Sequence, residues 1–325
     1  MQSIAIIGAG AAGLSLASSL ANAAEVRVFE KSRGLGGRLA NRRLGDAIVD
    51  HGAQFFTARH PGFQALLERA TERGDIAPWQ ARVLTLAPGN KPYRRVWFEP
   101  HYVGVPAMNA LTRLLAENVN IALQARVSRI ERHGGRWRLR TDSGDSLGSF
   151  DWVVSAAPAP QTEALLPATF TLRDSLRRCR FSACIALVLN GRDLPLPHCD
   201  AAVVRQSPLA WLARHRGRPG RQGDELLLLH SSNAWADDHI DASDDSIRST
   251  LLAALSELFD FDAMGVDVLH LQRWRLARVE AAADRDYLLD PSNRLAACGD
   301  WCRGDRVEDA FLSGRRLADA MTGYL

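Results

Sequence analysis

The stretch SIAIIGAGAAG, residues 3–13, decides the fold of this chain. A short apolar run ends at Gly8, and Gly8, Gly10 and Gly13 follow the pattern Gly-x-Gly-x-x-Gly. Gly8 permits a tight turn, Gly10 lets a pyrophosphate approach the backbone, and Gly13 lets a helix pack closely on the strand. We therefore expect a buried strand over residues 3–7 and a helix over residues 11–23 whose N-terminus faces phosphate groups.

The residues after this helix complete a strand–helix–strand unit. Residues 25–30 (EVRVFE) form a second strand-like run that ends on Glu30. Glu30 lies about 20 residues after the glycine turn, where a carboxylate can accept hydrogen bonds from a ribose diol. This unit predicts dinucleotide binding by Gly8, Gly10, Ala11, Gly13, Glu30 and Lys31.

The next segment, KSRGLGGR (residues 31–38), separates FAD from NAD. Gly36-Gly37-Arg38 resembles a signature of the flavin-containing amine oxidase superfamily, whose members carry Gly-Gly-Arg after the acidic residue. Paired glycines let the chain pass close to a cofactor, and the Arg38 guanidinium offers a fork of donors to phosphate. The resemblance implies that FAD is the cofactor and that Gly37 and Arg38 bind it.

Residues 50–59 (DHGAQFFTAR) resemble the stretch that runs beneath the flavin ring in that superfamily. The resemblance places Gln54 and Phe55 near the isoalloxazine, and it turns Phe56, Thr57 and Arg59 toward substrate. Taken without the resemblance, two adjacent aromatic residues would more simply indicate core packing.

Two later segments extend the resemblance along the cofactor. Relatives hydrogen-bond adenine through the main chain at the position of Val127. Cys298-Gly299-Asp300 follows a predicted strand, and the resemblance assigns Asp300 to the ribityl-phosphate region. It also assigns Val307 and Glu308 to a helix start that faces the pyrimidine end of the flavin, where the helix dipole would stabilise negative charge. Because Cys298 ends a buried strand, we expect non-covalent FAD.

The remaining sequence predicts an α/β fold in which a Rossmann-like FAD-binding domain of the glutathione-reductase type carries an inserted α+β substrate domain. Period-two alternation over residues 121–156 indicates a small antiparallel meander. We predict a discontinuous FAD-binding domain over residues 1–60, 104–160 and 291–325, and a substrate domain over residues 61–103 and 161–290. Further predicted elements are helices over 62–74, 105–117, 162–178, 243–259 and 307–322, strands over 182–189, 225–230 and 266–274, and an exposed arginine-rich loop over 214–224.

Composition excludes several classes of partner. A net charge of +3 over 325 residues demands neither nucleic acid nor an anionic membrane, and no obligatory protein partner is evident. The five cysteines include no CxxC pair, and no spacing typical of a metal site stands out. No basic segment precedes the apolar N-terminus, as a signal peptide would require, and glycines interrupt it. We therefore expect a cytoplasmic protein with free thiols and no bound metal.

A narrower resemblance suggests a substrate. Residues 211–214 (WLAR), 229–231 (LHS), Arg273-Trp274 and 298–302 (CGDWC) resemble the renalase family, particularly its short bacterial members. That family oxidises the 1,2- and 1,6-dihydro isomers of NAD(P) to NAD(P)+, and O2 takes the electrons to give hydrogen peroxide. The resemblance implies a dihydronicotinamide dinucleotide as substrate, bound by Phe55, Phe56, Thr57, Arg59, His230 and Trp274.

The lysine inventory bears on the alternatives. Typical amine oxidases of the superfamily place a lysine near the flavin ring, yet this chain has only Lys31, beside Glu30, and Lys91, in a proline-containing turn. Oxidation of a small amine stays open as the second reading. An NAD(P)H-dependent reductase or monooxygenase often carries a second Gly-x-Gly-x-x-Gly unit, and only one is present here. A non-catalytic flavin-binding protein is the remaining class.

Overall fold

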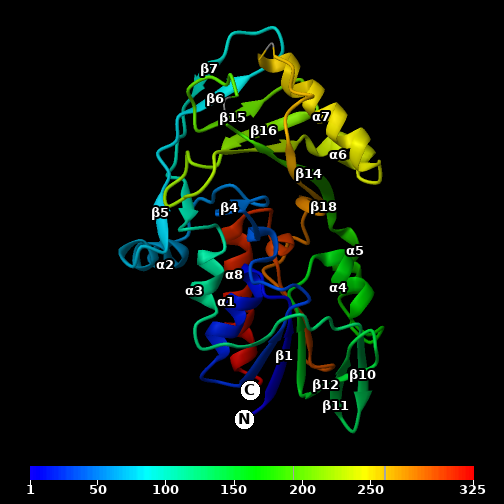
Figure 1. Ribbon diagram of the computed structural model, residues 1–325. Helices are drawn as coiled ribbons and strands as arrows, with labels where there is room; N and C mark the ends of the chain where they lie inside the picture. Colours follow the sequence, from blue (N-terminus) through cyan, green and yellow to red (C-terminus); the bar gives the residue numbers. More distant parts are fainter. Residues whose placement is uncertain (193, 260) are drawn as a thin grey trace.

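The computed structural model describes residues 1–192, 194–259 and 261–325. The first strand of the chain lies within a six-stranded sheet. The order is β19-β20-β13-β1-β2-β9, and every neighbouring pair is parallel except β19 with β20. Both chain termini lie at the same end of the molecule, beside β1 (Figure 1). The strands are β1 (Ser3–Ile7), β2 (Glu25–Phe29), β9 (Asn120–Ala122), β13 (Trp152–Ser155), β19 (Leu288–Asp290) and β20 (Leu295–Ala297).

One face of this sheet is covered by helices from both ends of the chain. The helices are α1 (Ala11–Leu20), α2 (Pro61–Glu72), α3 (Ala110–Leu115) and α8 (Val307–Thr322), and α1 and α8 lie side by side in Figure 1. Gly314 of α8 makes this contact close, since a Cβ there would overlap the carbonyl oxygen of Ala12. The segment 61–72, which we predicted within the substrate domain, thus packs in the same core as β1 and α1.

The other face is covered by a three-stranded meander and two short helices. The meander is β10 (Arg129–His133), β11 (Arg136–Arg140) and β12 (Ser146–Phe150), and the helices are α4 (Ala159–Leu165) and α5 (Arg173–Arg178). The single helix predicted over residues 162–178 is therefore two helices. Pro167 lies between them, and proline lacks the N–H that a continuous helix needs.

A seven-stranded sheet forms the other half of the molecule, in the order β18-β14-β17-β16-β15-β6-β7. Helices α6 (Asn233–His239) and α7 (Asp244–Phe259) cover its outer face, toward the top of Figure 1. The hairpin of β3 (Asn41–Leu44) and β4 (Ala47–Asp50) packs on its inner face. The strands of the sheet are β6 (Val83–Leu86), β7 (Tyr93–Arg95), β14 (Arg180–Asn190), β15 (Ala201–Val204), β16 (Leu209–Arg214), β17 (Leu226–Ser231) and β18 (Val268–Ala281).

A short strand pair and two short turns complete the fold. Strands β5 (Ile76–Pro78) and β8 (Tyr102–Gly104) pair with each other, and short 3-10 turns cover Gly37–Leu39 and Asp300–Cys302. Within the described residues, no helix combines the length and the apolar character needed to cross a bilayer.

Candidate cofactor and substrate cavity

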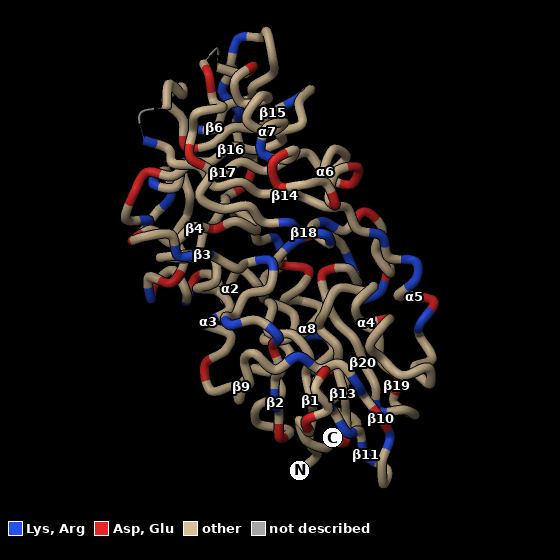
Figure 2. The backbone as a smooth tube through the Cα atoms, turned by 45° about the vertical axis from the view of Figure 1, so that its right-hand side comes forward, with Lys and Arg blue, Asp and Glu red and all other residues tan. Residues whose placement is uncertain are grey.

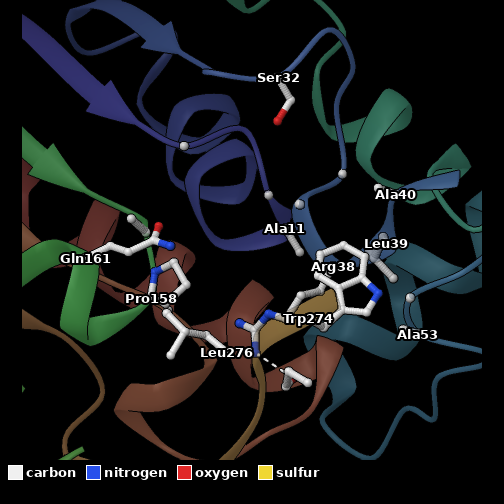
Figure 3. A pocket seen from close by; sticks show the side chains of 18 of the residues that line it. Ala11, Ser32, Arg38, Leu39, Ala40, Ala53, Pro158, Gln161, Trp274 and Leu276 are labelled. Carbon is white, nitrogen blue, oxygen red and sulfur yellow. Dashed lines mark hydrogen bonds between the residues drawn. The ribbon is translucent and has the colours of Figure 1, made fainter. Parts of the chain in front are cut away.

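A cavity of about 1760 Å³ runs from the carboxyl ends of β1 and β2 to strands β17 and β18. Typical small-molecule sites occupy roughly 300–1,000 Å³. This cavity therefore has room for a large cofactor together with a second molecule. Figure 3 shows part of its wall, including Ala11 from the start of α1 and Trp274 of β18.

The glycines of this turn have two different roles: some allow close packing, and one leaves open space. Gly8 adopts φ +111° and lies against the backbone of Ala156, and a Cβ on Gly13 would overlap the Gly8 carbonyl oxygen. A Cβ on Gly10 would meet no atom within 4 Å. Gly8, Gly10 and Ala11 line the cavity, whereas Gly13 serves the contact between α1 and β1. The bare backbone at Gly10 thus leaves space at the N-terminus of α1 for a phosphate.

Glu30 lies buried at the end of β2, beside this turn. Its two carboxylate oxygens accept the N–H groups of Ala9, at 2.9 Å, and Ser32, at 2.8 Å. Each oxygen keeps a free lone pair, so the carboxylate can also accept a ribose hydroxyl. Glu30 and the exposed Lys31 both line the cavity.

The two expected phosphate-region residues, Arg38 and Asp300, contact each other. Arg38 Nη2 lies 2.5 Å from Asp300 Oδ1, and Arg38 Nη1 donates to the carbonyl of Ala277 at 3.3 Å. Asp300 is buried, while the Arg38 side chain stays 30 % exposed toward the cavity. Gly37, at φ +55°, brings this segment within van der Waals distance of Gly10. The structure thus brings both glycine segments and the C-terminal aspartate to one place.

Near Glu30, at the β1 and β2 end of the cavity, Val127 is buried and lines the wall. Its backbone N–H has no hydrogen-bond partner among the described residues, so it is free to donate to a ligand. Val307, the first residue of α8, also lines the cavity. Glu308 does not: its buried carboxylate accepts the N–H groups of Arg59 and His60.

In the wall opposite the glycine turn, two side chains share the backbone carbonyl of His51 as their hydrogen-bond partner. Trp274 Nε1 donates to it at 2.9 Å, and His230 Nε2 lies 3.1 Å from it. The Trp274 and His51 rings are stacked, with centroids 5.4 Å apart and an interplanar angle of 22°. All three residues line the cavity. The shared carbonyl therefore fixes two aromatic side chains from different strands against the turn after β4.

Both histidines of this wall are neutral at physiological pH. Burial lowers the pKa of His230 to about 4, and it lowers the pKa of His51 to about 4 with a further contribution from His270. The carbonyl of His51 is an acceptor, so a neutral His230 carries its proton on Nε2. The wall thus presents apolar and neutral surface.

The other expected substrate residues lie outside the cavity lining. Phe55 belongs to an aromatic cluster with Trp79, Trp97, His101 and Trp211. Phe56 is buried against Phe63 in the core. Thr57 accepts a hydrogen bond from Arg306, and the exposed Arg59 pairs with Glu99 at 2.8 Å. Of the predicted substrate residues, only His230 and Trp274 line the cavity.

Residues between β16 and β17 form the predicted surface loop, but part of it is buried. His215, Arg218 and Arg221 in this loop are buried. Arg221 Nη2 lies 2.5 Å from Asp50 Oδ2, and Arg218 donates to the side-chain oxygen of Gln54. An arginine-rich loop is fully solvated only if its guanidinium groups find no buried carboxylate to pair with. Here Asp50 is such a carboxylate, and it draws part of the loop inside. Gln54 in turn lies in this network and outside the cavity lining.

Sequence reasoning also missed several residues of the wall. His51 lies within residues 50–59 and Trp211 within residues 211–214, the segments that carry the family resemblance, so their positions indicated the site. Cys184 and Gln272 carry no motif and are brought to the cavity by the register of β14 with β18, while Asn233 reaches it as the first residue of α6.

Comparison with known proteins places these features in a family. The sequence pattern described as flavin containing amine oxidoreductase matches residues 93–322, and the pattern of an NAD(P)-binding Rossmann-like domain matches residues 6–70. The chain belongs to the flavin-containing amine oxidoreductase family. The prediction of that superfamily, and of an α/β fold with a Rossmann-like domain, is confirmed.

Solved structures share this fold at low sequence identity. A candidate protoporphyrinogen oxidase from Exiguobacterium matches with a TM-score of 0.78 and 14 % identity, covering 100 % of this chain and 99 % of that one. Cyclohexylamine oxidase from Brevibacterium oxydans matches with a TM-score of 0.75 and 14 % identity, covering 99 % of each chain. Putrescine oxidase bound to putrescine matches with a TM-score of 0.72 and 12 % identity, covering 99 % of each chain.

The family cofactor is FAD, as predicted, and the residues of the cavity fit it. The open backbone at Gly10 and the N-terminus of α1 suit the pyrophosphate, and the second oxygen lone pairs of Glu30 suit a ribose. The unpaired N–H of Val127 suits a base edge, and α8 begins at the cavity wall. Each of these groups lines the one cavity or borders it, so a single dinucleotide can contact them together.

Proposed function

We propose that this chain is a renalase-like oxidase that converts the 1,2- and 1,6-dihydro isomers of NAD(P) to NAD(P)+. Nine basic and four acidic residues line the cavity, and six of the basic residues form ion pairs. Lys31, Arg33 and Arg42 form no ion pair within the described residues, and these three free cations are the observation that carries the proposal. An anionic dinucleotide is favoured there over a cationic amine. The cations are Lys31, Arg33, Arg38, Arg42, Arg126, Arg273, Arg275, Arg278 and Arg306; the carboxylates are Glu30, Asp142, Asp300 and Asp305.

The distribution of these cations supports binding of both FAD and a second anion. Figure 2 shows basic residues along β18, and Arg273, Arg275 and Arg278 of this strand line the cavity. Arg42 of β3 also lines the cavity and forms no ion pair within the described part of the chain. Positive charge therefore extends beyond the region that the FAD pyrophosphate occupies.

The residues of the wall suit a reaction that needs orientation more than proton transfer. When bound, FAD accepts a hydride and passes its electrons to O2, which yields hydrogen peroxide. A dihydropyridine loses hydride readily because the product ring is aromatic, so no general base is required. Trp274 and His51 offer stacked planar surface for a nicotinamide, and neutral His230 adds no charge near the cation that develops. Positioning of the reacting carbon is then the main contribution of the protein.

The location of lysine supports the same reading. Lys31 is the one lysine among the described residues that line the cavity, and it lies beside Glu30 at the ribose end. The wall formed by Trp274, His51 and His230 therefore holds no lysine amine. Oxidation of a small amine remains the second candidate, because the family as a whole is described by that activity.

We propose that FAD is held without a covalent bond. Cys298 is fully buried and lies outside the cavity lining. Cys184 does line the cavity, but burial raises the pKa of its thiol to about 12, so the nucleophilic thiolate is scarce at neutral pH. All five cysteines are free, which is the state expected in the cytoplasm, where we propose that the protein acts.

Anaerobic mixing separates the candidate functions. The FAD absorbance should bleach rapidly with 1,2- or 1,6-dihydro-NAD(P), and readmission of O2 should restore it with hydrogen peroxide formed. Bleaching by putrescine or cyclohexylamine alone would favour the amine reading. Rapid bleaching by ordinary NADPH would favour a reductase, and no bleaching by any donor would indicate a non-catalytic flavin-binding protein.

Trp274→Ala is expected to raise KM for the dihydronicotinamide isomer about tenfold, equal to about 1.4 kcal/mol, with a smaller change in kcat. The variant removes the planar surface that we assign to the nicotinamide. Trp235→Ala is the matched control, because that indole also stacks on a histidine, at 4.4 Å, but lies outside the cavity lining. Steady-state kinetics normalised to bound flavin measure both, and equal KM values for the two variants would contradict the assignment.

A further inference from the structure

A buried carboxylate and two buried arginines lie directly behind the cavity wall. The Asp50 side chain is 0 % exposed, and those of Arg218 and Arg221 are 1 % and 0 % exposed. Arg221 binds Asp50 Oδ2 through Nη2, at 2.5 Å, and through Nε, at 3.1 Å. It also donates to the carbonyl oxygens of Gly104 and Pro219. Arg221 and Asp50 therefore form a complete ion pair by themselves.

Arg218 is the second cation in this cluster, and its charge is poorly matched. Its Nη1 lies 3.6 Å from the Asp50 oxygen that already accepts Arg221. Its Nε has no hydrogen-bond partner. The other Asp50 oxygen accepts the Met108 N–H at 2.8 Å. Within the described residues, Asp50 is the only carboxylate that lies within 4.0 Å of either guanidinium.

The cluster thus holds one negative charge against two positive charges. Burial lowers the pKa of Arg218 to about 10, as expected for a cation with incomplete pairing, and the group stays protonated at neutral pH. A buried charge of this kind is costly to folding, and its field is weakly screened because water is excluded. Arg218 also lies over the Trp79 ring, 5.3 Å from its centroid, but this contact and the Gln54 hydrogen bond leave its charge without a carboxylate of its own.

Arg218 is linked to the cavity by two routes. It donates to the side-chain oxygen of Gln54, whose amide nitrogen donates to the carbonyls of Asp50 and Gly52, and Gly52 lines the cavity. Burial is the main cause of the lowered pKa of His230 in the cavity wall, and the charge of Arg218 adds a smaller contribution in the same direction. The field of Arg218 therefore reaches the wall that faces the substrate.

We propose that Arg218 stabilises the negative charge that enters the cavity when FAD is reduced. A hydride brings two electrons and one proton, so its transfer from the substrate to FAD leaves one additional negative charge on the cofactor side. Arg218 favours that product electrostatically without touching the reacting atoms. It is a positioning and electrostatic residue. The proposal rests on the FAD cofactor alone and holds for either candidate substrate.

The midpoint potential of bound FAD tests this proposal, measured by equilibration of the holoenzyme with a reference dye and a chemical reductant. Arg218→Met should make FAD about tenfold harder to reduce, a shift of about 30 mV to more negative potential. Arg218→Lys keeps the charge and should restore most of the wild-type value. Arg73→Met makes the same change in net charge at an exposed position outside the lining, and should leave the potential unchanged.

The sign of a second substitution separates charge from packing. Asp50→Asn removes the one negative charge of the cluster, so it should shift the potential to more positive values, opposite to Arg218→Met. Damage to packing would move both variants in the same direction. If Asp50→Asn fails to fold, the comparison of Arg218→Met with Arg218→Lys still decides. Equal potentials for those two variants, or no shift in Arg218→Met, would overturn the proposal. Because a chemical reductant is used, failure of the dihydronicotinamide assay leaves this test intact.

Discussion

A Gly10→Val chain is expected to fold and yet to lose FAD, with an affinity at least about tenfold below that of the wild type. Gly10 has φ −84°, which any residue can adopt, and its Cβ position meets no atom within 4 Å. The isopropyl group would therefore project into the cradle at the N-terminus of α1, where the pyrophosphate is expected. The flavin-to-protein absorbance ratio of the purified variant, and titration of apoprotein with FAD, measure the loss.

Stability should change little in the same variant. Gly10 is the N-cap of α1, and replacing glycine by an aliphatic residue at that position costs about 1 kcal/mol. Gly13→Val is the matched control, because its Cβ would overlap the Gly8 carbonyl oxygen and so force α1 away from β1. Gly13→Val should therefore lower the stability of the apoprotein strongly. If Gly10→Val kept full FAD occupancy, the turn would not be the phosphate cradle.

Local motifs predicted the cofactor half of the molecule well for a physical reason. The turn from Gly8 to Gly13 joins consecutive elements, so its geometry follows from residues adjacent in sequence. Glu30 ends the next strand of the same unit and could be placed in the same way. The strand–helix–strand unit and the FAD prediction both rest on this local logic, although the extent of each domain still stays a prediction.

Partners distant in sequence could not be predicted from composition or periodicity. Arg221 and Asp50 are separated by 171 positions in the sequence. The residues around Arg221 therefore give no indication that it pairs with a buried carboxylate. An arginine-rich segment with glycine and proline has the composition of an exposed loop, so composition predicted the loop over residues 214–224 but not the burial of Arg218 and Arg221. Phe55 shows the same limit: its aromatic partners come from β16 and from the segments around Trp79 and Trp97, which only the sheet topology brings together.

Acid should destabilise the FAD-loaded protein between about pH 6.5 and pH 4, through His51 and His230. Both have an unfolded-state pKa of 6.5 and a folded-state pKa of about 4, lowered by burial. Below pH 6.5 these histidines are protonated in the unfolded chain but stay neutral in the folded chain. The free energy of unfolding therefore decreases as the pH is lowered, until the folded-state pKa is reached. For each histidine, the free energy of unfolding falls by about 2 kcal/mol between about pH 7 and pH 5, and by about 3 kcal/mol over the whole window.

His230→Gln isolates this contribution, because the amide can still donate to the His51 carbonyl but cannot bind a proton in this range. Urea unfolding at about pH 7 and about pH 5 should show a pH-dependent loss smaller by about 2 kcal/mol in the variant than in the wild type. Burial also lowers the pKa values of His101, His215 and His270, so the wild-type loss is shared and the difference between the chains is the informative quantity. His133→Gln, at an exposed position, should keep the wild-type loss. An identical loss in His230→Gln and wild type would mean that His230 accepts its proton without cost, and the wall around the His51 carbonyl would then admit water.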